Sequence, residues 1–247
     1  GEIHLKSVDE FNYNRQIWKF LPSNHFISVH NMKLGDIYEG DYLEAVYEDE
    51  IKMSKIFDKI ISLPDKKSDN IARFKSISAF SKKWFSNKFI PTLLDIGSGT
   101  GVFPYLVKKN GWKCLAIDPD QRAVNHLKMK VEVDAIHGDF FKIKPFNKFD
   151  IITLNKVLEH VQNPIQMLSL TKKWIKNNGF LYLEVPDGEI SSLYGKNRGE
   201  FHIDHLHIFS VASVSIMANK AGYCIQNIYR LKEPSDKFTI RAFLSKK

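Results

Sequence analysis

Short apolar segments alternate with amphipathic segments from about residue 92 to the end of the chain. The apolar segments have the length of strands, and the amphipathic segments carry apolar residues at helical spacing. Gly111 and Gly222 stand where two of these helices would end. This order is typical of an α/β fold, and it predicts a seven-stranded, mostly parallel sheet with helices on both faces. The predicted strands are Thr92–Ile96, Lys113–Ile117, Ala135–His137, Phe149–Leu154, Phe180–Val185, Cys224–Arg230 and Phe238–Leu244, and the predicted helices are Val102–Asn110, Gln121–Lys130, Ile165–Lys176 and Val211–Ala221.

The first 90 residues read as helical. Met53, Phe57 and Ile60 share one helical face, and Ser68 can cap a second helix after Pro64. No linker separates this part from the rest of the chain. We therefore expect residues 1–90 to form a helical cap that folds against a main domain of residues 91–247. Three tyrosines of this cap could close over a ligand or serve only as core or interface aromatics: Tyr38, Tyr42 and Tyr47.

Composition narrows the class of protein. The chain has 247 residues, of which 43% are hydrophobic, enough for a buried core but without the long apolar run that a bilayer span needs. With only two cysteines, we expect a cytoplasmic protein that does not insert in a membrane. The net charge of +8 comes from scattered lysines. This pattern indicates a solvated basic surface that favours an anionic small molecule, and not a nucleic-acid groove.

The strongest local motif is the segment from Leu93 to Gly101, which reads LLDIGSGTG. An apolar strand runs into a glycine-rich turn and then a helix, so a ligand can lie against the main chain. The glycine spacing is G-x-G-x-G, whereas dinucleotide-binding turns use G-x-G-x-x-G. Asp95 stands just before the turn. The spacing therefore disfavours a nicotinamide oxidoreductase.

Further acids follow at the ends of the next strands. Asp118 ends the second strand, and the sequence from His137 to Phe140, HGDF, ends the third. The fourth strand, ending at Asn155, leads into KVLEHV over residues 156–161. Taken singly, these acids could be turn residues or helix caps. Together, at the same edge of a parallel sheet, they are better explained by one ligand.

These motifs, in this order, resemble those of the class I S-adenosylmethionine (SAM)-dependent methyltransferases over roughly the C-terminal two-thirds of the chain. The resemblance implies a Rossmann-like fold and SAM as cofactor, with S-adenosylhomocysteine as its product. It also implies that Asp118 binds the ribose hydroxyls, that Asp139 binds the adenine amine, that Phe140 provides an apolar neighbour for the adenine ring, and that the VLEHV segment lies beside the methionine end. The candidate cofactor-binding residues are Asp95, Gly97, Ser98, Gly99, Gly101, Asp118, Pro119, Asp139, Phe140 and Asn155.

The acceptor side is expected beyond the fourth and fifth strands. The long connection from Pro186 to Ser210 contains FHIDHLHIFS over residues 201–210. Together with Ala221-Gly222-Tyr223, it resembles a stretch of SAM methyltransferases that modify sugars and precursors of bacterial surface polysaccharides. Histidine is the natural base near neutral pH, although any one of these rings could instead only brace the loop. The candidate catalytic residues, in order of preference, are His205, His207, His202 and His160.

The sequence therefore favours O-methylation of a small glycan precursor, or of a phosphate- or phosphoramidate-type decoration of a surface (capsular) polysaccharide, with an anionic or nucleotide-linked acceptor. N-methylation of an amino sugar and a non-catalytic SAM-binding module remain alternatives. A nucleic-acid methyltransferase is disfavoured, because residues 155–158 read NKVL and lack the prolines of the adenine-specific enzymes. We predict no metal, since the resemblance requires none and no cysteine lies near these histidines; a zinc site is the less favoured alternative, because imidazole is a good zinc ligand. Asp187 could hold a substrate hydroxyl or start a turn, and the oligomeric state is left open.

Overall fold

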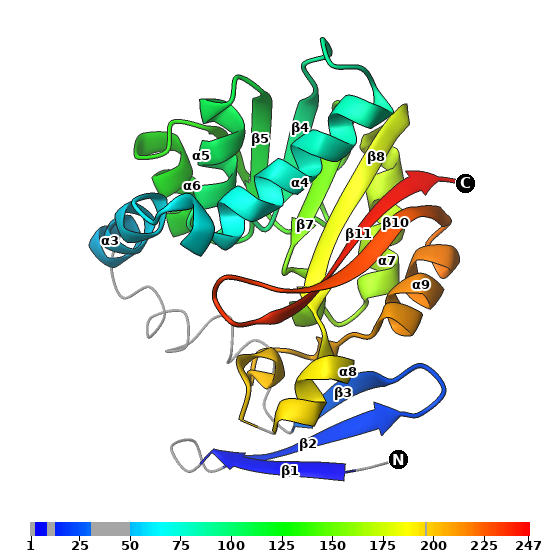
Figure 1. The fold of residues 1–247 in the computed structure, drawn as a ribbon. Helices are drawn as coiled ribbons and strands as arrows, with labels where there is room; N and C mark the ends of the chain where they lie inside the picture. The colour runs from blue at the N-terminus through cyan, green and yellow to red at the C-terminus, as the bar shows by residue number, and fades with distance from the viewer. Residues whose placement is uncertain (1–2, 9–12, 31–49, 196) are drawn as a thin grey trace.

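A seven-stranded sheet forms the centre of the molecule (Figure 1). The computed structural model describes residues 3–8, 13–30, 50–195 and 197–247. Within them the strand order is β10-β11-β8-β7-β4-β5-β6, and only β11 runs antiparallel to its neighbours. The predicted α/β fold is therefore confirmed. The strands are β4 (Thr92–Ile96), β5 (Lys113–Asp118), β6 (Asp134–His137), β7 (Phe149–Asn155), β8 (Ile175–Pro186), β10 (Tyr223–Lys232) and β11 (Phe238–Lys246).

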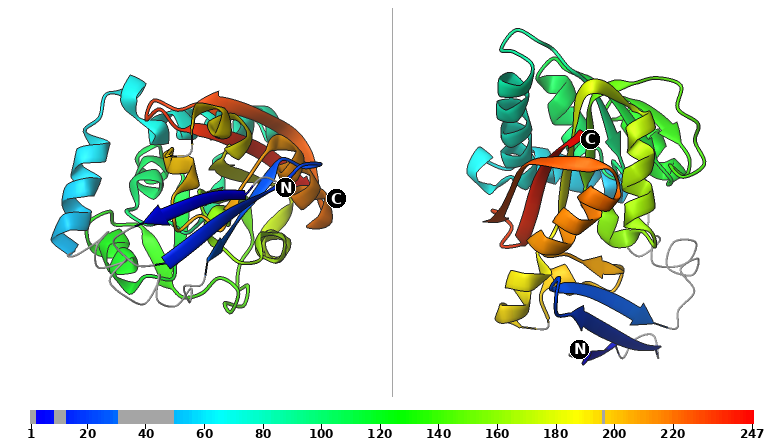
Figure 2. Two further views of the ribbon diagram at one scale, coloured as in Figure 1. Left: turned by 90° about the horizontal axis from the view of Figure 1, so that it is seen from below. Right: turned by 90° about the vertical axis from the view of Figure 1, so that its right-hand side faces the viewer.

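Helices cover both faces of this sheet because successive strand residues point to opposite sides. Leu93 and Ile151 face the layer that holds α4 and α5, whereas Leu94 and Ile152 face the layer that holds α7 and α9 (Figures 1 and 2). All four of these leucine and isoleucine side chains are fully buried. The helices are α3 (Glu50–Ile61), α4 (Asp69–Trp84), α5 (Val102–Lys109), α6 (Gln121–Met129), α7 (Pro164–Leu170), α8 (Gly188–Ser191) and α9 (Val211–Lys220).

The prediction that residues 1–90 are helical is confirmed for α3 and α4 and wrong for residues 3–8 and 13–30, the described residues before them. Phe57 of α3 packs its ring against Tyr105 and His126, and Phe74 of α4 belongs to the core beneath the sheet. Residues 3–30 instead form β1 (Ile3–Val8), β2 (Tyr13–Phe20) and β3 (His25–His30). These strands form a four-stranded sheet, in the order β1-β2-β3-β9, with the short strand β9 (His207–Ile208). Tyr38, Tyr42 and Tyr47 lie outside the described residues.

The small sheet lies below the carboxyl end of β8, next to α8 (Figures 1 and 2). Its inward positions alternate along β2 and β3, with Arg15, Ile17, Phe26 and Ser28 buried. Two of these four side chains are polar, so the apolar residues do not alternate along β2 and β3 and the sequence pattern does not predict strands there. Arg15 donates from Nε to Ser28 Oγ at 2.6 Å, so the polar pair satisfies itself inside the sheet.

One boundary in the main domain also differs from prediction. The helix expected to reach Lys176 ends at Leu170, with a single 3-10 turn over Thr171–Lys173 after it. Ile175 already pairs with Phe149 of β7, and the register shifts before Phe180 pairs with Ile151. The apolar residues continue at helical spacing into the irregularly paired start of β8, which explains why the sequence predicted a longer helix. Within the described residues, no helix combines the length and apolar character needed to cross a bilayer.

Candidate functional site

The glycine-rich turn joins β4 to α5 at the carboxyl edge of the sheet. Gly97 has φ +73°, and a Cβ there would lie 2.7 Å from a methyl carbon of Val157, so this position requires glycine. Gly99 has φ +50° and open space where a Cβ would stand, so a ligand can approach its main chain. Ser98 stabilises the turn by donating from Oγ to the Asp95 carbonyl at 3.2 Å.

Asp118 lies at the end of β5 and fastens the turn from the other side. Its two carboxylate oxygens accept hydrogen bonds from the backbone N–H of Gly99 at 2.8 Å and of Asp120 at 2.9 Å. Burial raises the pKa of the Asp118 carboxyl above its ordinary value. Each carboxylate oxygen has a second lone pair, so Asp118 can still accept hydrogen bonds from a pair of hydroxyls.

Asp95 and Asn155 form a polar pair beneath the turn. Asp95 Oδ1 accepts hydrogen bonds from Thr153 Oγ1 at 2.6 Å and from Asn155 Nδ2 at 2.8 Å. Burial raises the pKa of Asp95 to about 6. The buried Oδ1 of Asn155 has no hydrogen-bond partner among the described residues. An acidic group beside an unused buried acceptor fits a ligand that brings a cationic donor, as the amino group of SAM does.

Two of the expected adenine contacts have different surroundings. Asp139 is partly exposed, accepts from the Phe141 N–H at 3.0 Å and pairs with Lys142 at 3.3 Å, so it can reach a ligand. Phe140 is only 5% exposed and packs its ring against Trp174 in the core, with 5.7 Å between ring centroids. The Phe140 ring thus belongs to the core, and its contact with adenine stays a prediction. Pro119 is exposed beside Asp118.

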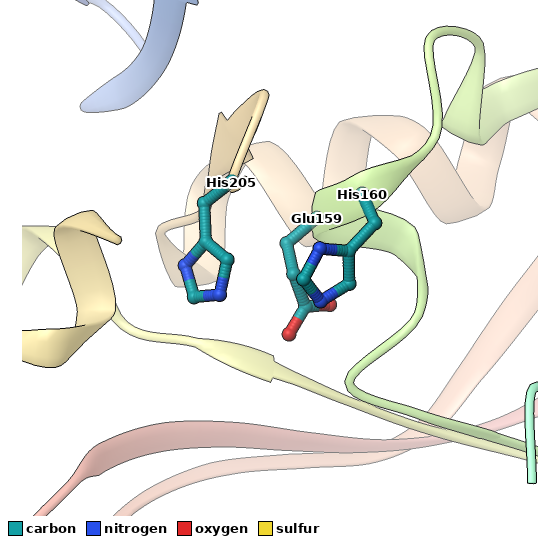
Figure 3. Close-up of side chains that lie close together, drawn as sticks. All are labelled: Glu159, His160 and His205. Atoms are coloured by element: carbon teal, nitrogen blue, oxygen red, sulfur yellow. The ribbon is translucent and has the colours of Figure 1, made fainter. Parts of the chain in front are cut away.

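Three of the four candidate catalytic histidines meet in one cleft of 330 Å³. His160 comes from the 3-10 turn after β7, and His205 comes from the loop before β9 (Figure 3). His202 belongs to the same loop as His205. The rings of His160 and His205 stand edge to face with centroids 4.9 Å apart. Burial lowers the pKa of His205 to about 4 and also lowers the pKa of His160. Further lining residues are Lys156, Glu159, Pro186, Gly199, Glu200, Asp204, Lys237, Phe238 and Thr239.

Backbone carbonyls fix how the two buried rings are turned. His205 Nδ1 lies 2.8 Å from the Glu200 carbonyl oxygen, and His160 Nδ1 lies 3.1 Å from the Asp204 carbonyl oxygen. A carbonyl oxygen can only accept, so each ring carries its proton on Nδ1. In a neutral imidazole the other nitrogen, Nε2, then has a lone pair.

Asp204 and Glu159, which also line this cleft, were not among the candidate catalytic residues. Asp204 Oδ1 lies 2.5 Å from His202 Nδ1. Burial alone would raise the pKa of Asp204, but the His202 hydrogen bond and the neighbouring histidines hold it well below its usual range. Glu159 is 1% exposed, and burial raises its pKa to about 8. Their positions next to histidines, in the sequences EH and HIDH, are the signal that could have found them.

His207 lies outside this cleft. Its Nδ1 lies 3.1 Å from Nε2 of His25, and both rings line a separate, mostly apolar groove between the small sheet, α7 and α9. The structure therefore does not bring His207 together with the other three candidate histidines. Asp187 caps α8, since its carboxylate accepts from the N–H groups of Glu189 at 3.1 Å and Ile190 at 3.2 Å. This contact supports the interpretation of Asp187 as a turn residue.

Comparison with known proteins agrees with this geometry. Residues 52–227 match the family model described as a methyltransferase domain. The chain is 26% identical over 146 residues to the cypemycin N-terminal methyltransferase of Streptomyces sp, which covers 56% of this chain and 59% of that protein. It is 32% identical over 107 residues to the mitochondrial ubiquinone biosynthesis O-methyltransferase of Schizosaccharomyces pombe, which covers 40% of this chain and 38% of that protein.

A solved structure shows the same fold. A SAM-dependent methyltransferase from Aquifex aeolicus superposes with a TM-score of 0.56 at 21% identity, over 79% of this chain and 98% of that one. The curated relatives are matched over only 59% and 38% of their own length, so they do not assign an acceptor to the whole protein. The family model, however, covers most of the chain and includes the glycine-rich turn and the acids at the strand ends. The chain thus belongs to the methyltransferase domain family, and it shares the fold of a SAM-dependent methyltransferase.

Proposed function

We propose that the protein transfers a methyl group to a hydroxyl oxygen of a small polar acceptor held in the histidine-lined cleft. The observation that carries this proposal is the meeting of His160, His202 and His205 in a cleft that also includes Lys156, the residue after Asn155. We call the candidate cofactor-binding residues at the ends of β4, β5, β6 and β7 the cofactor crevice. Because Lys156 directly follows Asn155, the histidine-lined cleft adjoins this crevice along the chain. Lys237 also lines it, which suits an anionic acceptor.

Different residues of the cofactor crevice would bind different parts of the cofactor. Asp95 and Asn155 hold the amino-acid end, Asp118 accepts from the ribose hydroxyls, and Asp139 accepts from the adenine amine. When bound, SAM supplies a methyl group already activated on a sulfonium. An acceptor hydroxyl is a poor nucleophile until its proton leaves. His205, whose Nε2 has a lone pair directed into the cleft, is the first candidate to act on that hydroxyl.

For the acceptor we propose a glycan precursor, or a phosphate- or phosphoramidate-type decoration, destined for a surface polysaccharide. The resemblance of residues 201–223 to sugar-modifying methyltransferases and the basic charge support this class. N-methylation of an amino sugar is the second candidate, because one relative in the comparison is an N-terminal methyltransferase and another an O-methyltransferase. A non-catalytic SAM-binding module would have no use for the histidine cleft.

The test is a methyl-transfer screen with methyl-labelled SAM against sugar nucleotides, phosphorylated sugars, phosphoramidates and amino sugars. We expect label on a hydroxyl oxygen, and a fall in turnover of about 10²–10⁴ in His205→Ala with nearly unchanged cofactor affinity. His207→Ala is the matched control and should keep its rate. Label on nitrogen alone would replace the O-methylation proposal with the second candidate, and no transfer to any class would contradict both.

A further inference from the structure

Glu159, His160 and His205 direct their polar ends toward one point of the cleft (Figure 3). One ligand atom from each, a carboxylate oxygen and two imidazole nitrogens, lies within 4.8 Å of the others. From this arrangement we infer that the cleft is a binding site for a divalent transition-metal cation of the Zn²⁺ type. Zinc sites with three protein ligands often use two histidines and one glutamate, and they leave a position open for substrate.

The orientation of the rings is the first independent support. Nδ1 of His205 and Nδ1 of His160 each lie within hydrogen-bond distance of a backbone carbonyl, at 2.8 Å and 3.1 Å. Metal-binding histidines commonly donate their second ring N–H to such a carbonyl, which fixes the ring and leaves the other nitrogen for the metal.

The second support is the buried carboxylate. Glu159 is 1% exposed, and in the part of the chain that the structure describes its Oε2 has no hydrogen-bond partner. A carboxylate oxygen buried without a partner is costly unless a cation or donor is present. Among the groups that line the cleft, Asp204 is a further acid, and Lys156 is engaged by Glu233 and Glu184. A divalent cation would satisfy this oxygen.

The donor set selects the kind of cation. Two imidazoles and one carboxylate suit zinc and neighbouring transition metals, whereas Mg²⁺ and Ca²⁺ prefer oxygen ligands throughout. Ligand atoms around a tetrahedral zinc stand about 3.4 Å apart, given bonds of about 2.1 Å. Closing from the present spacing requires only a small movement of side chains. Asp204, whose Oδ1 lies 3.7 Å from His205 Nε2, adds negative charge beside the site.

The role inferred for the cation rests on the proposed O-methylation. In that reaction the cation would activate the acceptor hydroxyl. An acceptor hydroxyl oxygen on the open position becomes more acidic, because the cation stabilises the alkoxide. The proton then passes to His202, which Asp204 orients through the 2.5 Å contact at Nδ1. In this arrangement His205 acts through the metal, and the residue that takes the proton is His202.

The binding test needs no acceptor. Metal-stripped protein is titrated with Zn²⁺ by calorimetry and, separately, with Co²⁺, whose visible absorption reports the ligand set. We expect one equivalent to bind in the wild type, and Glu159→Gln, His160→Ala and His205→Ala to weaken it on the order of 100-fold or more. His207→Ala is the matched control, because it removes one ring of the other histidine pair. Circular dichroism confirms that each variant is folded.

Absence of stoichiometric binding in folded wild type, or binding lost only in His207→Ala, would overturn the metal site. With an acceptor in hand, chelation should abolish methyl transfer and Zn²⁺ or Co²⁺ should restore it. Full activity after chelation would overturn the activating role. Failure to find any acceptor bears on the proposed function alone, because the titrations decide the metal site without turnover.

Discussion

At the carboxyl edge of the large sheet, Asp118 and Asp95 each stabilise the surrounding structure and are also candidates for binding the ligand. Asp118 holds the backbone of Gly99 and Asp120 and has lone pairs left for a ligand. Asp95 anchors Thr153 and Asn155 while its carboxyl is buried. Removing either side chain therefore changes both the shape of the crevice and its charge, and the two effects have to be separated by the choice of substitution.

Asp118→Ala should weaken binding of S-adenosylhomocysteine by about 2–4 kcal/mol, since it removes charge-assisted hydrogen bonds to two hydroxyls. Calorimetry with the wild type should show no binding of NAD. Asp134→Ala, at the exposed opposite end of the neighbouring strand β6, is the control and should bind normally. Equal affinity in wild type and Asp118→Ala would remove Asp118 from the ribose site.

Asp95 should make cofactor affinity depend on pH. With its pKa raised to about 6 by burial, the carboxyl gains a proton as the pH falls through that value. Arg73 is the charged residue that influences the Asp95 carboxyl, and Thr153, Ser98 and Asn155 are the polar neighbours of Asp95. Affinity for S-adenosylhomocysteine should be steady at pH 7 and fall below pH 6, approaching about tenfold per pH unit.

The measurement is a calorimetric series between pH 7 and pH 5, where the amino group of the ligand stays protonated. Asp95→Asn keeps the shape of the side chain but cannot titrate, so its weaker affinity should be flat across the series. A wild-type affinity that is equally flat would show that Asp95 does not face the amino-acid end of the cofactor.

At the scale of elements, the strength of the alternating pattern decided what the sequence could predict. The central strands β4, β7 and β11 are buried on both faces along nearly all of their length, and their positions followed from the sequence. The acids of the cofactor crevice followed too, because parallel strands end at one edge. The histidine-lined cleft could not be predicted in this way. His205 lines the cleft but His207 does not, and the course of the loop that carries them depends on its pairing with β3. The polar inward residues Arg15 and Ser28 hid that partner strand.

Arg15 should position the acceptor loop. It is 1% exposed and donates to the backbone carbonyls of Phe201 at 2.6 Å, His202 at 2.7 Å and His205 at 3.3 Å. Arg15→Ala removes this donor, and the buried carbonyl of Phe201 left without a partner costs about 1–3 kcal/mol. We expect turnover to fall steeply, with cofactor affinity within about twofold of wild type, since the crevice lies on other elements.

Gln16→Ala is the control for Arg15→Ala, because the next residue of a strand points to the opposite face. Hydrogen exchange should quicken in β2, β3 and residues 199–206 of Arg15→Ala only, and remain unchanged in β4, β5 and β7. Arg15→Lys supplies a single donor group and should recover part of the rate. Loss of cofactor binding together with turnover would mean that Arg15 supports the whole fold and not the loop.

At the scale of the whole molecule, the described parts of residues 1–90 contact the main domain through the small sheet, α3 and α4. The small sheet reaches the acceptor loop through β9, and α3 packs against α5 and α6 next to the cofactor crevice. We predict that this region closes over the crevice when the cofactor binds. Hydrogen exchange with and without S-adenosylhomocysteine should show added protection between Tyr38 and Arg73. Unchanged protection throughout that span would contradict closure.

The pairing of β3 with β9 also imposes an order on how the chain becomes an enzyme. His25 and His207, which meet across these strands, are 182 positions apart. As the chain leaves the ribosome, the hairpin of β2 and β3 emerges early and has to wait for its partner until most of the large sheet has been made. Such long-range pairing forms slowly. The crevice, built from residues 92–155, can assemble first, so a nascent chain acquires the ability to hold its cofactor before it acquires a place for the molecule that receives the methyl group.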